Sequence, residues 1–479
     1  MEAVTRSAIL AVLCAADFLV VLDALVVAVA LPAMQQALTI PAGALQWTIT
    51  SYVLCFGGFL LFGGRLGDLF GRRRVLVAGL LMFAAGSLLA GLAWTPVALF
   101  AGRAVQGLGA AAMAPTALAL LTTTFAEPAA RNRALGVWSA ASSAGIPAGA
   151  LLGGVLTATG GWRWVFLVTV VAAVAAAVAT RAVVPESAAD NASDRLDWAG
   201  AVLATAGLSL VIAAISRAEQ ARGPAELSAR VAAPLLLGAV LLAAFVLVER
   251  RTRAPLVPLD QLRIPGQLSA NLVGLVLPVG LGAALFLATL YLQRVQGLGP
   301  LVTGAVYLAL AVPCIAASPL ASRLATRTGR PVTASVGLLL QVAGLVVLAR
   351  AGADSGLAGV FIGFVLVGLG APIAFVPTTA AAMDSPTGDP GLASGIFNTS
   401  QQLGNAVALA AIATLAAAWT ARNSGAEPDP AALAAGYHAG FLLAAAFVVT
   451  GLLPAIRLDA RRSHDAEAAS TSPRDHAGH

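Results

Sequence analysis

Uninterrupted apolar stretches dominate the pattern of hydrophobic and polar positions along this chain. No charged residue occurs in five long ranges: 75–102, 134–162, 264–293, 331–349 and 390–421. A helix that crosses a bilayer needs about 20 mostly apolar residues, whereas the strands of a membrane barrel alternate apolar and polar positions. The pattern therefore predicts an all-α membrane protein that crosses the bilayer many times.

Fourteen apolar spans fit between the polar and charged positions. We expect them near residues 7–31, 44–63, 75–93, 97–120, 134–158, 164–184, 197–215, 231–248, 268–292, 301–321, 332–350, 357–381, 394–419 and 433–454. The composition agrees with this placement, because 59% of the residues are hydrophobic and only 10% are charged, against about 25% charged residues in a soluble domain.

The arginines predict how the spans are oriented. An even number of spans places both termini on one side, and the segments on that side hold 20 arginines against 7 on the other. Because basic loops stay in the cytoplasm, we expect both termini to be cytoplasmic. The same rule accounts for the net charge of +6 without a nucleic-acid partner. The composition, rich in alanine, glycine and arginine, indicates the inner membrane of a bacterium.

A weak internal repeat predicts the domain organisation. With a shift of 258 residues, GRLGDLFGR (64–72) aligns with SRLATRTGR (322–330), and repeated halves are common in transporter folds. We expect an N-terminal six-helix bundle at 1–190, a two-helix insert at 191–260, a C-terminal six-helix bundle at 261–456 and a polar tail at 457–479.

Five charged residues crowd the loop between the second and third spans, GGRLGDLFGRRRV (63–75). An acid does not suit the partial negative charge at the C-terminus of the preceding helix, so Asp68 needs an arginine or a helix N-terminus as its partner. We interpret Gly64, Asp68, Gly71, Arg72 and Arg73 as a latch that holds two helices together in one conformation. Anchoring of the topology by the arginines alone is the alternative.

Asp23 is, in our interpretation, the only acid well inside an apolar span, where a charge costs at least about 2.5–3.5 kcal/mol. A carboxyl group whose surroundings favour its neutral form, and whose neighbouring cation favours its charged form, can bind and release a proton. We expect a proton carrier or cation site, with a fixed ion pair as the alternative. Arg103 is the only basic residue that we place inside a span rather than at its end, and Gln106 follows on the same helix face.

Glycines recur every four residues in the fifth span, at Gly145, Gly149 and Gly153, with Pro147 and Gly154 beside them. Small residues at this spacing let helices approach closely. We expect this face to seal an interface between the two halves of the chain. Close packing without a further role is the alternative.

These motifs together resemble one known family. The 63–75 loop resembles the motif between spans 2 and 3 of the major facilitator superfamily, and LFAGRAVQGLGAA (99–111) resembles its span-4 motif. LDALVVAVALP (22–32), WSAASSAGIPAGALLGG (138–154) and ASGIFNTSQQLGN (393–405) are similar to motifs of its fourteen-spanner drug:proton antiporters. The resemblance implies a major facilitator fold and places spans 1 and 4 side by side, so that Arg103 would control the protonation of Asp23.

The function that we expect is proton-coupled export of drugs, antibiotics or amphipathic metabolites by alternating access, as antiport and as a monomer. With one acid in the spans, we expect neutral, zwitterionic or monocationic substrates. The alternatives are a dedicated metabolite exporter, a proton-coupled uptake symporter and a non-transporting receptor or scaffold. We expect no enzyme activity, cofactor or metal. Candidate cavity residues are Trp47, Tyr52, Gln106, Asn271, Gln293, Asn398 and Gln401.

Overall fold

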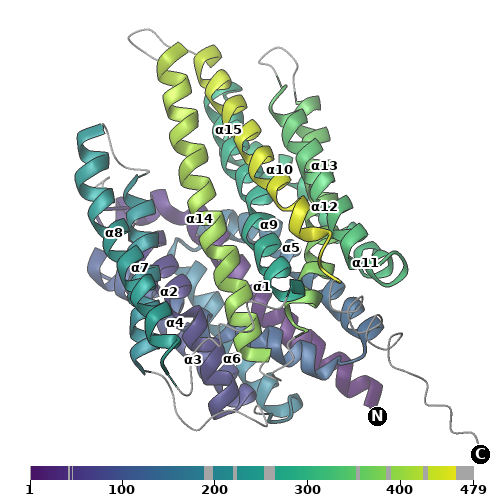
Figure 1. Ribbon diagram of the computed structural model, residues 1–479. Helices are drawn as coiled ribbons and strands as arrows, with labels where there is room; N and C mark the ends of the chain where they lie inside the picture. Colours follow the sequence, from purple (N-terminus) through teal and green to yellow (C-terminus); the bar gives the residue numbers. More distant parts are fainter. Residues whose placement is uncertain are drawn as a thin grey trace, which may run out of the picture.

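The computed structural model describes residues 2–40, 44–45, 47–187, 198–218, 224–252, 265–351, 357–384, 390–423 and 430–459, and every regular element within them is a helix (Figure 1). Thirteen of the described helices are long and apolar enough to cross a membrane. The fourteenth expected span is α7, whose described apolar stretch is the shorter Val202–Val211. The prediction of an all-α protein with about fourteen spanning helices is confirmed.

The first six spans correspond to one helix each. These are α1 (Glu2–Ala37), α2 (Trp47–Phe70), α3 (Arg72–Gly91), α4 (Pro96–Thr124), α5 (Pro128–Thr159) and α6 (Arg163–Val183). The next two spans are α7 (Trp198–Ala218) and α8 (Pro224–Glu249), which pack on each other, while α7 also contacts α2 and α14.

The remaining spans include two helices that are interrupted. α9 (Pro265–Leu290) ends in a π-helical turn (Tyr291–Val295), and the following span is divided at Tyr307 into α10 (Pro300–Val306) and α11 (Leu308–Arg327). The last elements are α12 (Arg330–Leu348), α13 (Ala358–Ala382), α14 (Pro390–Asn423), α15 (Pro430–Thr450) and the short α16 (Leu452–Ala455).

Two helix pairs repeat the same close packing. A Cβ atom at Gly109 of α4 would lie 2.7 Å from the carbonyl oxygen of Gly79 in α3, and one at Gly370 of α13 would lie 2.5 Å from that of Gly337 in α12. Gly79 and Gly337 are 258 residues apart, the shift of the sequence repeat. The pairs α3–α4 and α12–α13 are therefore equivalent, and in both the backbones touch where only glycine fits.

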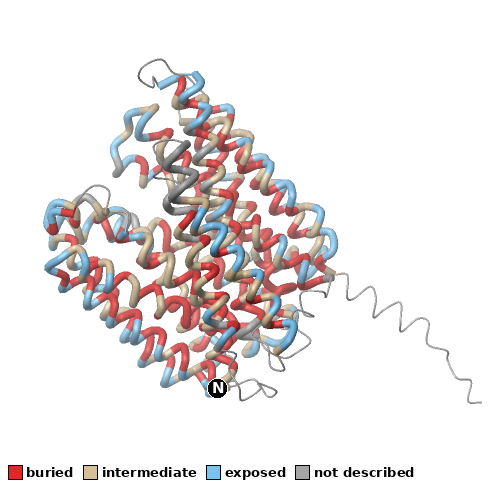
Figure 2. Tube along the Cα trace, turned by 60° about the vertical axis from the view of Figure 1, so that its left-hand side comes forward, coloured by how far each residue is buried: buried red, intermediate tan, exposed pale blue. Residues whose placement is uncertain are grey.

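The first six and the last six spans meet through α5 against α11 and through α14 against α2 and α4. Buried positions lie mainly on the inner sides of the helices, while exposed positions lie mainly on their outer sides (Figure 2). Many outer positions are large and apolar, such as Val171 and Val178 of α6 and Leu236 of α8, each more than 60% exposed. An apolar outer surface of this kind suits contact with lipid.

Candidate functional site

Asp23 and Arg103 form a buried ion pair between α1 and α4. Arg103 Nη1 lies 2.5 Å from Asp23 Oδ2, and both side chains are almost completely excluded from solvent. Gln106 joins them, since its Oε1 accepts a hydrogen bond from Arg103 at 2.9 Å and its Nε2 donates one to Asp23 Oδ1 at 3.0 Å. Two residues that were expected to act together are thus in direct contact.

Groups other than Asp23 also contact the Arg103 guanidinium. Arg103 Nε donates to the carbonyl oxygen of Thr48 in α2 at 2.9 Å, and the guanidinium lies 4.5 Å from the ring centre of Tyr52. Gln106 Nε2 also donates to Ser87 Oγ of α3 at 2.6 Å. A buried charge is tolerated only when it is paired and hydrogen-bonded. Residues of four helices, α1 to α4, form the network around these two charges.

A separate cavity of about 240 Å³ lies between the two sets of helices. Its polar lining includes Asp17 of α1, Ser142 and Ser143 of α5, and Asn398 and Gln401 of α14. Its apolar lining includes Trp138, Leu281 and Phe375. A mostly apolar cavity with a few converging polar groups is the usual form of a small-molecule site.

The cavity includes only part of the predicted lining. Asn398 and Gln401 line it, whereas Tyr52 and Gln106 belong to the buried network around Arg103. Asn271 does not line the cavity; its Oδ1 accepts a hydrogen bond from Ser400 Oγ, with 3.3 Å between the two atoms. Trp47, at the start of α2, and Gln293, in the π-helical turn, are exposed.

Asp17 is the site residue that the sequence reasoning missed. It lies well inside α1 and its Oδ2 accepts a hydrogen bond from Ser142 Oγ. The expectation that Asp23 is the only acid inside a span was therefore wrong. Asp17 stands six residues before Asp23 in the same apolar range, and that position alone was the signal available in the sequence.

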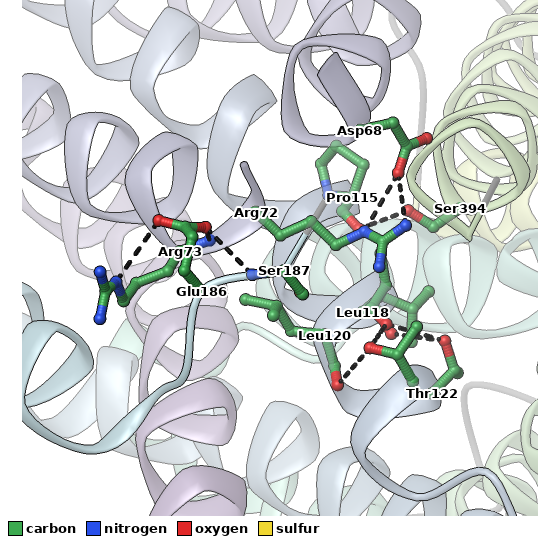
Figure 3. Close-up of polar contacts among 12 residues, drawn as sticks. Asp68, Arg72, Arg73, Pro115, Leu118, Leu120, Thr122, Glu186, Ser187 and Ser394 are labelled. Atoms are coloured by element: carbon green, nitrogen blue, oxygen red, sulfur yellow. Dashed lines mark hydrogen bonds and ion pairs between the residues drawn. The ribbon is translucent and has the colours of Figure 1, made fainter. Parts of the chain in front are cut away.

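Residues 63–75, which were expected to form a loop, belong to α2 and α3 except for Gly71, so the junction between the two helices is compact. Gly71 has φ +98°, which L side chains rarely adopt, and it alone separates the two helices. Asp68 and Arg72 form a buried ion pair, with Arg72 Nη2 2.9 Å from Asp68 Oδ1 (Figure 3). The partner that Asp68 required is thus an arginine four residues later.

The segment after α6 caps the start of α3. The backbone N–H of Arg72 donates to the carbonyl oxygen of Ser187 at 2.8 Å, and that of Arg73 donates to Glu186 Oε1 at 3.0 Å (Figure 3). The Glu186 carboxylate also lies 3.4 Å from Arg73 Nε and from Arg74 Nε. An acid at a helix N-terminus is stabilised by the helix dipole. Arg73 and Arg74 therefore contact the segment after α6, in addition to any effect they have on the orientation of the spans.

The two sets of helices touch close to this loop. Ser394 Oγ of α14 donates to the carbonyl oxygen of Pro115 in α4 at 2.5 Å, beside the Asp68–Arg72 pair (Figure 3). A Cβ atom at Gly395 would lie 3.3 Å from the carbonyl oxygen of Leu60 and 3.7 Å from Gly64 Cα. The α14 backbone therefore lies against α2 at Gly64, and Ser394 links it to α4.

A second link at the same end is ionic. Asp384, directly after α13, forms ion pairs with Arg131 of α5 and with Arg330 of α12, the latter at 2.5 Å. Asn132 Nδ2 also donates to Thr326 Oγ1 at 3.2 Å. Asp384 thus connects an arginine of the first six spans to one of the last six.

The glycine face of α5 packs within the first six spans. Cβ atoms at Gly145 and Gly149 would lie 2.9 Å from Val21 Cγ1 and 2.7 Å from Leu25 Cβ of α1, and Gly153 likewise faces α1. The expectation that this face seals the interface between halves was wrong. α5 meets α11 through another face, where Ser143 Oγ lies 2.9 Å from Cys314 Sγ. Pro147 lies within α5, and a Cβ atom at Gly154 would have no heavy atom within 4 Å.

Comparison with known proteins gives a consistent result. The model of the Major Facilitator Superfamily matches residues 13–409. The puromycin resistance protein pur8 of Streptomyces alboniger is 38% identical over 97% of this chain and 93% of its own length. The cephamycin export protein CmcT of Amycolatopsis lactamdurans is 37% identical over 94% of this chain and 93% of its own length.

Solved structures show the same fold at lower sequence identity. The human organic anion transporter MFSD10 (TETRAN) matches with a TM-score of 0.67 and 15% identity, over 94% of this chain and 99% of that chain. The proton:xylose symporter XylE matches with a TM-score of 0.62 and 15% identity, over 95% of each chain.

Proposed function

This chain belongs to the major facilitator superfamily, and from that premise we propose that it exports antibiotics or related amphipathic compounds in exchange for protons. The names of its relatives support export, since they include resistance to puromycin and export of cephamycin. The single observation that supports proton coupling is the buried pair of Asp23 and Arg103.

Binding of a proton to Asp23 removes the negative charge of this pair. While Asp23 is ionised, Arg103 is neutralised and α1 is held against α4. When Asp23 takes a proton, the arginine loses its counter-ion in a site closed to solvent, where an unpaired charge is unfavourable. Protonation therefore favours a rearrangement of α1 relative to α4, and release of the proton restores the pair.

We infer how access to the cavity alternates from the contacts at the loop end, which is the end of the helices where α2 meets α3. In the arrangement described here, Ser394 contacts Pro115 and Asp384 joins Arg131 to Arg330. With the termini in the cytoplasm, as the arginine distribution favours, these contacts close the cytoplasmic entrance. Release of the contacts opens the cavity to the cytoplasm for substrate, and their return accompanies export.

The driving force is sufficient for useful export. A membrane potential contributes about 2.3 kcal/mol per charge per 100 mV. If one net charge moves per cycle, this sustains a gradient of roughly 50-fold, since about 1.4 kcal/mol corresponds to a factor of ten.

Proton movement in proteoliposomes tests the proposal. A dye reports internal pH while puromycin and other antibiotics are added, with wild type compared with Asp23→Asn. We expect substrate-evoked proton flux that is lost in the variant and runs opposite to the drug. Flux in the same direction as the drug would indicate symport, and equal flux in both proteins would remove Asp23 from the mechanism.

A further inference from the structure

Arg163 carries a positive charge at the end of the helices opposite to the loop end. It is the first residue of α6, and its Nη2 donates to the carbonyl oxygen of Ala93 at 2.9 Å. Its guanidinium lies 4.4 Å from the ring centre of Trp162 and 5.2 Å from that of Trp94, but it forms no ion pair with any described residue. The side chain is only half-buried, so a negative partner can reach it from outside the protein.

The start of α6 adds to the positive potential around Arg163. A helix N-terminus carries partial positive charge, and the first turn of α6 holds no acid and receives no hydrogen bond from a capping side chain. The Nε1 of Trp162, which directly precedes α6, is buried and has no hydrogen-bond partner in the described part of the chain. A guanidinium at an uncapped helix start is an arrangement that favours an anion.

An apolar stripe leads away from Arg163 along α6. Exposed apolar side chains recur on one helix face at spacings of four, three and seven residues, at Trp164, Val168, Val171 and Val178. α3 packs beside α6 at the same end, where a Cβ atom at Gly91 would lie 3.1 Å from Phe166 Cβ, and the adjoining Leu92 is 54% exposed. The charged end of α6 thus continues into an apolar surface that faces outward.

We propose that the seam between α3 and α6 at this end binds an acidic phospholipid. Arg163 and the start of α6 bind the headgroup phosphate, and the acyl chains follow the stripe from Trp164. Trp94, which is 82% exposed, lies at headgroup depth, where tryptophan is commonly found. No described carboxylate contacts Arg163 that could receive the ammonium group of a zwitterionic lipid, so a headgroup with net negative charge is preferred.

Photocrosslinking in vesicles tests the proposal. The full-length protein carries p-benzoylphenylalanine in place of Trp164 and is reconstituted with phosphatidylcholine as the major lipid and phosphatidylglycerol as the minor one. Mass spectrometry then gives the ratio of the two lipids attached to the protein, a ratio that does not depend on the yield of folded protein. We expect phosphatidylglycerol to be enriched about fivefold over its share of the bilayer, as one arginine near a membrane surface provides.

Variants assign the enrichment to Arg163. Arg163→Gln should return the ratio to that of the bilayer, and Arg163→Lys should keep most of the enrichment because it keeps the charge. Arg422→Gln is the matched control. Arg422 also lies over a tryptophan ring, 5.8 Å from the centre of Trp419, but it stands in the last turn of α14, where the partial charge of the helix is negative. This control should enrich phosphatidylglycerol as the unsubstituted protein does.

Two further arms decide the nature of the ligand. Inorganic phosphate should lower the enrichment no further than chloride of the same ionic strength does, because a free ion makes no contact with the apolar stripe. Chloride itself should lower it gradually, since salt screens exposed charges, and this arm needs no variant if Arg163→Gln is poorly folded. A bulk lipid ratio in the unsubstituted protein, enrichment that survives in Arg163→Gln, or specific loss of enrichment in phosphate would each overturn the proposal.

Discussion

Arg103 Nη1 stands 2.5 Å from Asp23 Oδ2, and neither side chain is more than 1% exposed. Each charge is therefore stabilised by the other rather than by water, and the state of one determines the stability of the other. Gln106, which is also in α4, forms one hydrogen bond with Arg103 and one with Asp23. The ion pair and these hydrogen bonds therefore connect α1 to α4.

Removing one member of this pair should cost more stability than removing both. Arg103→Gln leaves the Asp23 carboxylate buried without a cation, and breaking a buried pair in this way costs about 3–5 kcal/mol. The double variant Asp23→Asn/Arg103→Gln has no buried charge and should recover most of that loss. Thermal unfolding in detergent, followed by tryptophan fluorescence, gives the comparison.

Arg74→Gln is the control for that series, because its side chain is 76% exposed and exposed ion pairs contribute little. It should unfold within a degree or two of wild type, on the scale of about 2–4 °C per kcal/mol for a large domain. A double variant as unstable as Arg103→Gln would contradict the account of the pair.

Asp68→Asn should impair transport without preventing membrane insertion. The substitution removes the negative charge that Arg72 contacts at 2.9 Å, in a site where both side chains are buried. We expect the contact region of α2, α4 and α14 to loosen and drug-evoked proton flux to fall at least tenfold. The measurement is flux per reconstituted molecule, with protein in the membrane fraction quantified in parallel. Normal turnover in the variant would show that the 63–75 segment only fixes the membrane topology.

Much of the fold could be predicted because a bilayer imposes simple rules. The apolar runs locate the helices, and the repeat of residues 64–72 at 322–330 reappears as the equivalent helix pairs α3–α4 and α12–α13. The meeting of Asp23 with Arg103 could be predicted only through family resemblance, since 80 residues separate them in the chain.

The remaining features depend on which way a helix face points. The period of Gly145, Gly149 and Gly153 shows that one face of α5 is smooth, but it does not identify the helix that covers it, which is α1. Asp17 and Asp23 look alike in sequence, and only the rotation of α1 distinguishes the acid that faces Arg103 from the acid that faces the cavity.

Gly149→Ala should destabilise the protein through the contact of α5 with α1. The new methyl group would lie 2.7 Å from Leu25 Cβ and 2.8 Å from the carbonyl oxygen of Leu22, so the two backbones must separate. Overpacking of this kind costs about 1–3 kcal/mol. Gly154→Ala on the same helix is the matched control, because its Cβ atom would have no neighbour within 4 Å. Equal unfolding temperatures for both variants would contradict this packing.

Asp384→Asn should shift the conformational equilibrium at the loop end. Asp384 pairs with both Arg131 of α5 and Arg330 of α12, so its loss leaves two positive charges near one another without the carboxylate that they share. Like charges in proximity repel, and the first and last spans should move apart there more often than in wild type.

Spin labels at Glu127 and Thr328, which are exposed at this end of α5 and α11, report the separation by double electron–electron resonance. We expect a longer-distance population to grow in Asp384→Asn and the wild-type distribution to persist in Asp459→Asn. Arg131→Gln in the Asp384→Asn background removes one of the two facing charges and should reverse part of the shift. An unchanged distribution in Asp384→Asn would show that the hydrogen bond from Ser394 to Pro115 and its neighbouring contacts hold this end closed without the ionic link.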